Sequence, residues 1–160
     1  MESTEREELN LEKKVTVRSI APWATGFRRF DNTGDVMIPP KGTVRLSRNE
    51  IISQVQNGNT LLNGTDSRGS HATLIVEDRP TRVEIDFESE DGKITQKVLT
   101  EDLVKKLFNY KTQKSFEENL KKFVVTRAEK YALVEMIEKL KLNDFNKIRA
   151  VEEYTGIRVE

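Results

Sequence analysis

The pattern of apolar and polar residues divides the 160-residue chain into two parts that meet near Thr100. Before that point apolar and polar residues alternate in short runs, and Gly, Pro and Asp-Gly turns separate the runs. This pattern predicts strands at residues 14–20, 24–30, 36–47, 72–78, 82–88 and 93–99. Several short strands with turns between them predict a small antiparallel β-sheet or barrel.

One stretch of the first part follows a helical period instead. Ser47 followed by Glu50 is the pattern of a capping box, in which each residue's side chain bonds to the other's backbone. Apolar residues then recur on one helical face until Asn57-Gly58, a pair that commonly ends helices. We therefore expect one helix inserted in the sheet.

Residues 100–157 follow the helical period throughout. Thr100 precedes two acidic residues in a first turn, Ser115 pairs with Glu118, and Thr126 pairs with Glu129, so three helix starts are indicated. Asn143 is a candidate cap for a fourth helix, which Gly156 ends. The second part therefore predicts a bundle of about four short helices.

The fold expected from these patterns is α+β. Residues 1–13 carry many charges and few apolar residues, so we interpret them as a flexible arm, either a frayed terminus or a segment that becomes ordered on a partner. Residues 14–99 form the β-rich domain and residues 100–160 the helical domain. No linker rich in Gly, Pro or Ser separates the two, so we expect them to pack on each other.

Composition excludes several kinds of function. The 27 Lys and Arg balance 27 Asp and Glu, and no strongly basic segment indicates nucleic-acid binding. The chain has no cysteine, which rules out disulfides, thiolate metal sites and cysteine nucleophiles. The first residues resemble neither a signal peptide nor a membrane span, so we expect a soluble protein of a cytoplasm or of a particle assembled there.

The loop at residues 63–71 contains two glycines and the only histidine, His71. An enzyme would use His71 as a general base with Asp66, but no nucleophile motif accompanies them. The alternative is a turn, in which the side chain of Asp66 caps the backbone and His71 anchors the next strand. We favour the second interpretation and expect an exposed protein-contact loop formed by Asp66, Arg68 and His71.

No metal or cofactor is expected. Five carboxylates could offer oxygen ligands, but their spacing does not match a calcium loop, and Arg68 would occupy a ligand position. These carboxylates are Asp66, Glu77, Asp78, Glu84 and Asp86. The glycines of the loop also lack the order of a phosphate-binding loop.

Aromatic and basic residues gather between residues 23 and 30, where Trp23, Arg28 and Arg29 stand beside two phenylalanines. These residue types are enriched in protein interfaces, so the three are candidate protein-contact residues. The alternative hypothesis is a nucleic-acid-binding accessory protein, a barrel with a helical module. It would use two arginines and four lysines: Arg28, Arg29, Lys105, Lys106, Lys121 and Lys122.

Three runs carry a resemblance to a known group: IPPKGTVRLSRNEIISQVQNGN, RGSHATLIVED and LNDFNKIRAVEEYTGIRV. With the chain around them, over residues 15–158, they resemble uncharacterised proteins from genomes of tailed bacteriophages of Gram-positive hosts. The resemblance implies a virion component that binds proteins. We therefore expect a non-enzymatic, head- or capsid-associated structural protein, with other virion proteins or copies of itself as partners and a place in the virion or host cytoplasm.

Overall fold

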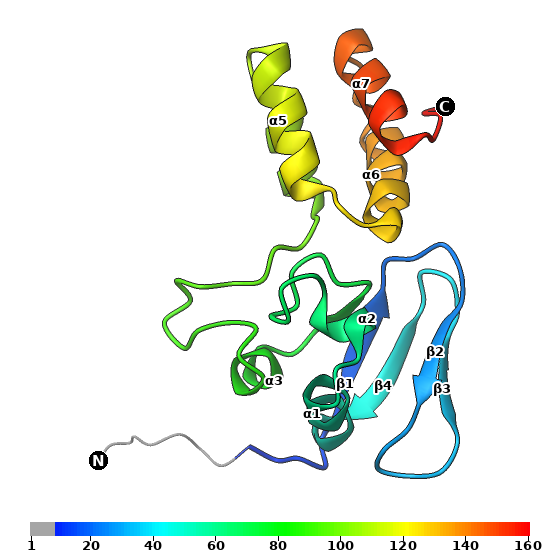
Figure 1. Ribbon diagram of the computed structural model, residues 1–160, viewed down its shortest axis with the longest axis vertical. Coiled ribbons are helices and arrows are strands. Elements are labelled where there is room, and N and C mark those ends of the chain that lie inside the picture. The colour runs from blue at the N-terminus through cyan, green and yellow to red at the C-terminus, as the bar shows by residue number, and fades with distance from the viewer. Residues whose placement is uncertain (1–8) are drawn as a thin grey trace.

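Three antiparallel strands form the larger sheet of the computed structural model, which describes residues 9–160 (Figure 1). The strand β1 (Lys14–Ser19) lies between β4 (Thr43–Ser47) and β5 (Leu74–Val76). Val17 is opposite a valine in each neighbouring strand and is fully buried. Apolar residues at alternate positions of β1 therefore face the core, as the alternation predicted.

A separate hairpin pairs β2 (Thr25–Arg28) with β3 (Asp35–Ile38). No ladder of hydrogen bonds joins this hairpin to the larger sheet within residues 9–160. The α+β class and the small antiparallel sheets are confirmed, and the strands form two open ladders instead of a barrel. The inserted helix is also confirmed, as α1 (Arg48–Gln56), and a single turn, α2 (Thr60–Asn63), follows it.

The strand expected at residues 82–88 is wrong. The chain forms α3 (Arg79–Glu84) instead, because Asp78 caps the Thr81 amide at 3.2 Å and Pro80 lies in the first turn, where its missing N–H costs nothing. Here a local cap outweighs the alternation of apolar and acidic residues.

The strand expected at residues 93–99 is wrong too. This stretch is irregular, and its polar groups bond to the loop before β5. The His71 amide donates to the Lys97 carbonyl at 2.9 Å, and the Lys97 amide donates to Ser70 Oγ at 2.9 Å. Because a side chain supplies one of the two bonds, the pair does not continue as a ladder.

Four helices form the C-terminal half, as predicted. They are α4 (Glu101–Phe108), α5 (Gln113–Phe123), α6 (Arg127–Leu140) and α7 (Phe145–Thr155). The caps at Thr100 and Thr126 are confirmed, and Thr126 forms a complete capping box. The caps expected at Ser115 and Asn143 are wrong by a few residues, since Thr112 caps α5 and Asp144 caps α7.

Each half has its own apolar core, and a third cluster lies between them. The helical core gathers buried residues of all four C-terminal helices, and the β core gathers residues of the strands, α1 and α2. The cluster between them consists of Ile20, Ala21, Ala72, Ile75 and Ala128, with Val98 packed against it. Figure 1 shows the helices stacked on one end of the β half.

The expected N-terminal arm lies mostly outside the described residues. Its last part contacts the start of α1, where the Arg48 amide donates to the Lys13 carbonyl and the Asn49 amide to the Leu11 carbonyl. These bonds occupy amides that a helix start leaves free. Within residues 9–160, no helix has the length and apolar character needed to cross a membrane.

Candidate functional site: the joint and three surface elements

A buried hydrogen bond between a histidine and a glutamate joins the two halves. The Nδ1 atom of His71 lies 2.9 and 3.0 Å from the two carboxylate oxygens of Glu129, on α6. Glu129 is 1% exposed and also accepts the amides of Val125 and Thr126. One carboxylate therefore completes the capping box of α6 and holds the end of the 63–71 loop.

Around this pair, α6 makes further contacts with the β half. Trp23 meets Tyr131 edge to face, with ring centroids 5.8 Å apart, and the Arg127 guanidinium lies 5.5 Å from the Trp23 ring. Farther along the helix, Glu135 pairs with Lys41. We call this set of contacts the joint. Trp23 therefore lies at the contact between the halves, and 36% of the Trp23 surface remains exposed.

A small cleft of about 170 Å³ lies beside the joint. Lys41, Arg18 and Lys139 line it, and each of them is ion-paired, with Glu135, Glu77 and Glu101 respectively. Burial lowers the pKa of Lys41, and the charge of Glu138 opposes that shift. Because every charged side chain in the cleft has a protein partner, we interpret the cleft as part of the joint.

The 63–71 loop is ordered by its own side chains, as expected for a turn. Asp66 accepts the amides of Arg68 at 2.8 Å and Ser70 at 3.1 Å. Burial opposes ionisation of Asp66, but these hydrogen bonds outweigh it, so its pKa lies below the ordinary value. Asp66 and Arg68 are exposed, whereas His71 is 8% exposed and bonds to Glu129. The structure therefore removes His71 from the expected contact loop and gives it a carboxylate partner other than Asp66.

The β2–β3 hairpin presents one face to the core and the other to solvent. Val36 and Ile38 are buried, while Met37 is 66% exposed. Met37 is paired with Gly26, and a Cβ at that glycine would lie 2.7 Å from the methionine sulfur. The glycine therefore lets the Met37 side chain lie across the outer face.

The tip of the hairpin is held by a buried carboxylate, Glu50. It accepts the amides of Phe30 at 3.0 Å and Asp31 at 2.8 Å, and Gln54 donates to it at 2.6 Å. Burial opposes its ionisation, but these hydrogen bonds outweigh it and lower the pKa of Glu50. The expected capping box at Ser47 is thus half present, because Ser47 caps the Glu50 amide while the Glu50 side chain bonds to the hairpin.

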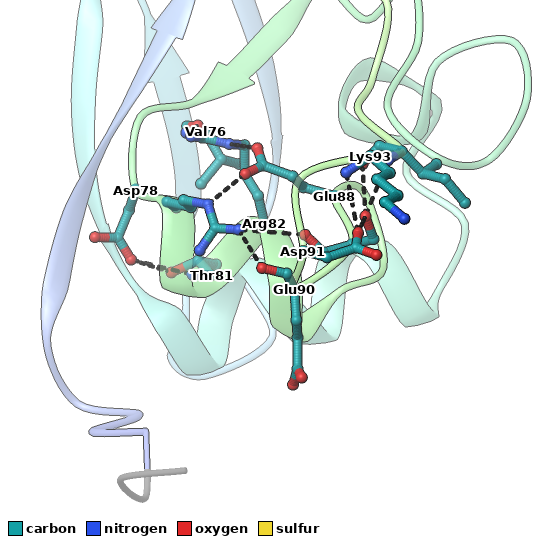
Figure 2. Close-up of polar contacts among 11 residues, drawn as sticks. Val76, Asp78, Thr81, Arg82, Glu88, Glu90, Asp91 and Lys93 are labelled. Atoms are coloured by element: carbon teal, nitrogen blue, oxygen red, sulfur yellow. Dashed lines mark hydrogen bonds and ion pairs between the residues drawn. The ribbon is translucent and has the colours of Figure 1, made fainter.

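A third ordered element is the long segment between α3 and α4, which projects from the β half opposite the hairpin (Figure 1). Two arginines of α3 hold it, and Figure 2 shows one of them, Arg82, beside Glu88. Arg79 Nε and Arg82 Nε donate to Glu88 at 2.5 and 3.1 Å, and Arg79 also donates to the carbonyls of Ser89 and Glu90. Asp91 closes the tip by accepting the Lys93 amide at 3.0 Å.

This network makes the segment sensitive to acid. Burial would raise the pKa of Glu88, but hydrogen bonds and charge from Arg82 and Arg79 outweigh it and lower the pKa below its ordinary 4.5. A depressed carboxylate pKa stabilises the folded state above the ordinary value, and that stabilisation is lost as the pH falls through the folded-state pKa. We expect amide-exchange protection of residues 85–95 to fall first when the pH decreases from about 7 to about 3.5.

Hydrogen-exchange mass spectrometry with correction for intrinsic rates measures this change. Glu88→Gln should already have low protection near neutral pH and a smaller acid-dependent loss than the parent, since only Asp91, whose pKa is also lowered, then remains in this turn. Glu84→Gln, at the last residue of α3 and without an ion pair among residues 9–160, should behave as the parent. Equal pH profiles for the parent and Glu88→Gln would contradict the assignment.

The candidate residues taken from the sequence do not form one surface. Trp23 lies at the joint, Arg28 and Arg29 at the far end of β2, and Asp66 and Arg68 in the loop before β5. Figure 1 also places β2 in the β half, away from α5, which carries Lys121 and Lys122 of the nucleic-acid hypothesis.

Glu129 and Glu50 are the buried groups that sequence reasoning missed as site residues. Glu129 was identifiable only as a capping-box partner, because its contact with His71 spans 58 positions. Within residues 9–160, no group of three or more His, Asp and Glu residues is placed to hold a metal ion.

Comparison of the chain with protein-family models, curated proteins and solved structures gave no match.

Proposed function

We propose that this chain is a non-enzymatic structural protein that acts by binding other proteins, and that the outer face of the β2–β3 hairpin is its contact surface. One observation carries the proposal. Two large apolar side chains, Met37 and Phe30, are 66% and 54% exposed on one ordered hairpin. Methionine, phenylalanine and arginine are enriched in interfaces, and Arg28 lies on the same outer face.

The hairpin is also preorganised, which favours binding. Its inner face packs in the β core, and Glu50 and Gln54 hold its tip through the Phe30 amide and the Arg28 carbonyl. A partner would then order few additional side chains, so less conformational entropy opposes the contact. In the setting that the sequence resemblance implies, the protein is a head- or capsid-associated virion component, and its partners are other virion proteins or copies of itself.

The hairpin proposal is tested with a photo-crosslinking amino acid at position 37 while the chain is co-expressed with the products of neighbouring genes. We expect a specific crosslinked protein, and we expect Phe30→Asp to abolish it. The same group at Glu153, an exposed position of α7, is the matched control and should give no such product. If position 37 yields no crosslinked protein, the hairpin is not the contact surface and the proposal fails, whatever the oligomeric state of the chain.

The proposal that the chain is a virion component is tested separately. Mass spectrometry of purified particles from the producing host should detect the chain at a constant copy number per particle. If the chain is absent from particles but still forms the hairpin crosslink, the virion proposal fails and the proposal of protein binding through the hairpin stands.

A further inference from the structure

Charges that balance over the whole chain are separated in space. Residues 84–91 contain five carboxylates and no basic residue, whereas residues 105–122 contain six lysines and two glutamates. The first stretch belongs to the projecting segment after α3, and the second covers α4 and α5. The balanced total therefore hides an acidic element and a basic element.

The acidic element is an ordered tip. Arg79 and Arg82 neutralise Glu88, and the turn closed by Asp91 displays Ile94, which is 58% exposed. Glu84 and Glu90 are exposed, and Figure 2 shows the Glu90 side chain pointing away from the loop. We call residues 84–94 the acidic tip. Its irregular backbone is held by polar contacts while an apolar side chain stays in solvent, as is frequent in binding loops.

The basic element has its own exposed apolar residue. Gln113, at the start of α5, donates to the Asn146 carbonyl at 3.0 Å, which places the start of α7 beside the start of α5. Phe145 is 73% exposed there, and Lys111 and Lys114 are exposed and have no ion-pair partner among residues 9–160. We call Lys111, Lys114 and Phe145 the lysine end. In Figure 1 the starts of α5 and α7 lie at the top of the helical half, well away from the acidic tip.

We propose that the acidic tip of one copy binds the lysine end of a second copy. The two surfaces carry exposed charges of opposite sign, and each also has one exposed apolar residue, so both their charge and their apolar area are complementary. Within one molecule the two surfaces are too far apart to meet, so they pair between molecules. Because the two patches differ, the contact is head to tail and produces rings or open chains.

The chain itself is then one of its protein partners, which rests on the proposed function only in that both require protein contacts. The acidic tip and the lysine end are separate from the β2–β3 hairpin. A Met37→Glu variant is therefore expected to keep self-association, and charge variants of the tip or lysine end are expected to keep the hairpin crosslink.

The test is charge exchange between two variants. One carries Lys111→Glu and Lys114→Glu, and the other carries Glu84→Lys and Glu90→Lys. We expect the parent chain to exceed the 18.5 kDa monomer mass in light scattering at about 20 mM salt and to approach it at about 500 mM, because salt screens exposed charges. Each variant alone should be monomeric, and an equimolar mixture should assemble again.

Restoration in the mixture, which neither variant shows alone, distinguishes pairing from a general effect of charge. A parent chain that stays monomeric at low salt overturns the inference, and so does assembly that neither variant weakens. A random DNA duplex serves as the competing probe. If the lysine variant loses DNA binding while the parent shows no self-association, the basic face is a nucleic-acid surface and the inference is wrong, whatever the hairpin crosslink shows.

Discussion

Replacing Glu129 by alanine is expected to lower the free energy of unfolding by about 3 kcal/mol, because hydrogen bonds to a charged acceptor are strong and its removal leaves buried donors without a partner. The carboxylate is 1% exposed and accepts from His71, Val125 and Thr126. Its loss leaves His71 without its hydrogen-bond partner and two amides without their acceptor. Urea unfolding followed by circular dichroism measures the change.

The same variant should loosen the joint. Trp23 is the only tryptophan and packs on Tyr131 of α6, so its fluorescence reports whether the halves stay docked. We expect the fluorescence transition of Glu129→Ala to begin at lower urea than the transition in circular dichroism, although the two coincide in the parent.

Glu118→Ala, at an exposed position of α5, is the control and should change stability by less than about 0.5 kcal/mol. In a His71→Ala background, Glu129→Ala should cost less than it does alone, because the shared hydrogen bond is already absent. Additive effects of the two substitutions would mean that the pair does not couple the halves.

Replacing Gly64 by alanine is the second change with a large expected effect, about 3 kcal/mol. Gly64 follows α2 with φ 70° and ψ −154°, a conformation that residues with a Cβ essentially avoid. An added Cβ would also collide with the Ser70 carbonyl, which accepts the Thr65 amide across the base of the loop. The backbone of the loop would have to move, and His71 with it.

Gly58→Ala is a matched control for this prediction. Gly58 has a similar φ of 79°, but an added Cβ meets nothing within 4 Å, so only the backbone cost of about 1 kcal/mol remains. Thermal unfolding of both variants measures the difference. Equal losses at the two positions would show that the packing around Gly64 adds nothing to its conformational cost.

The two wrong strand predictions show where alternation alone is a poor guide. Residues 82–88 alternate apolar and acidic side chains, yet Asp78 and Pro80 begin a helix just before them. Residues 93–99 have β-like composition, but no strand among residues 9–160 pairs with them, and Ser70 and Gly69 bond to their polar groups instead. A strand needs a neighbour with a free edge, which the period of one segment does not reveal.

The candidate surfaces were partly predictable for a related reason. Arg28 was identifiable because it stands in an exposed position of an alternating run, and the acidic run at residues 84–91 is visible in the sequence. His71 looked like a loop residue, because its partner Glu129 is far along the chain and on another element.

By itself the sequence determined the α+β class, the inserted helix and the four C-terminal helices, because caps and helical stripes depend on residues three or four positions apart. Only the tertiary structure decided which charges are buried and where the two halves meet. Glu50 and Glu129 stand at the glutamate position of a capping-box pattern, as many exposed glutamates do, yet contacts across 19 to 58 positions surround them with donors. Burial of a charge depends on partners that folding brings together, and those partners leave no local pattern in the sequence.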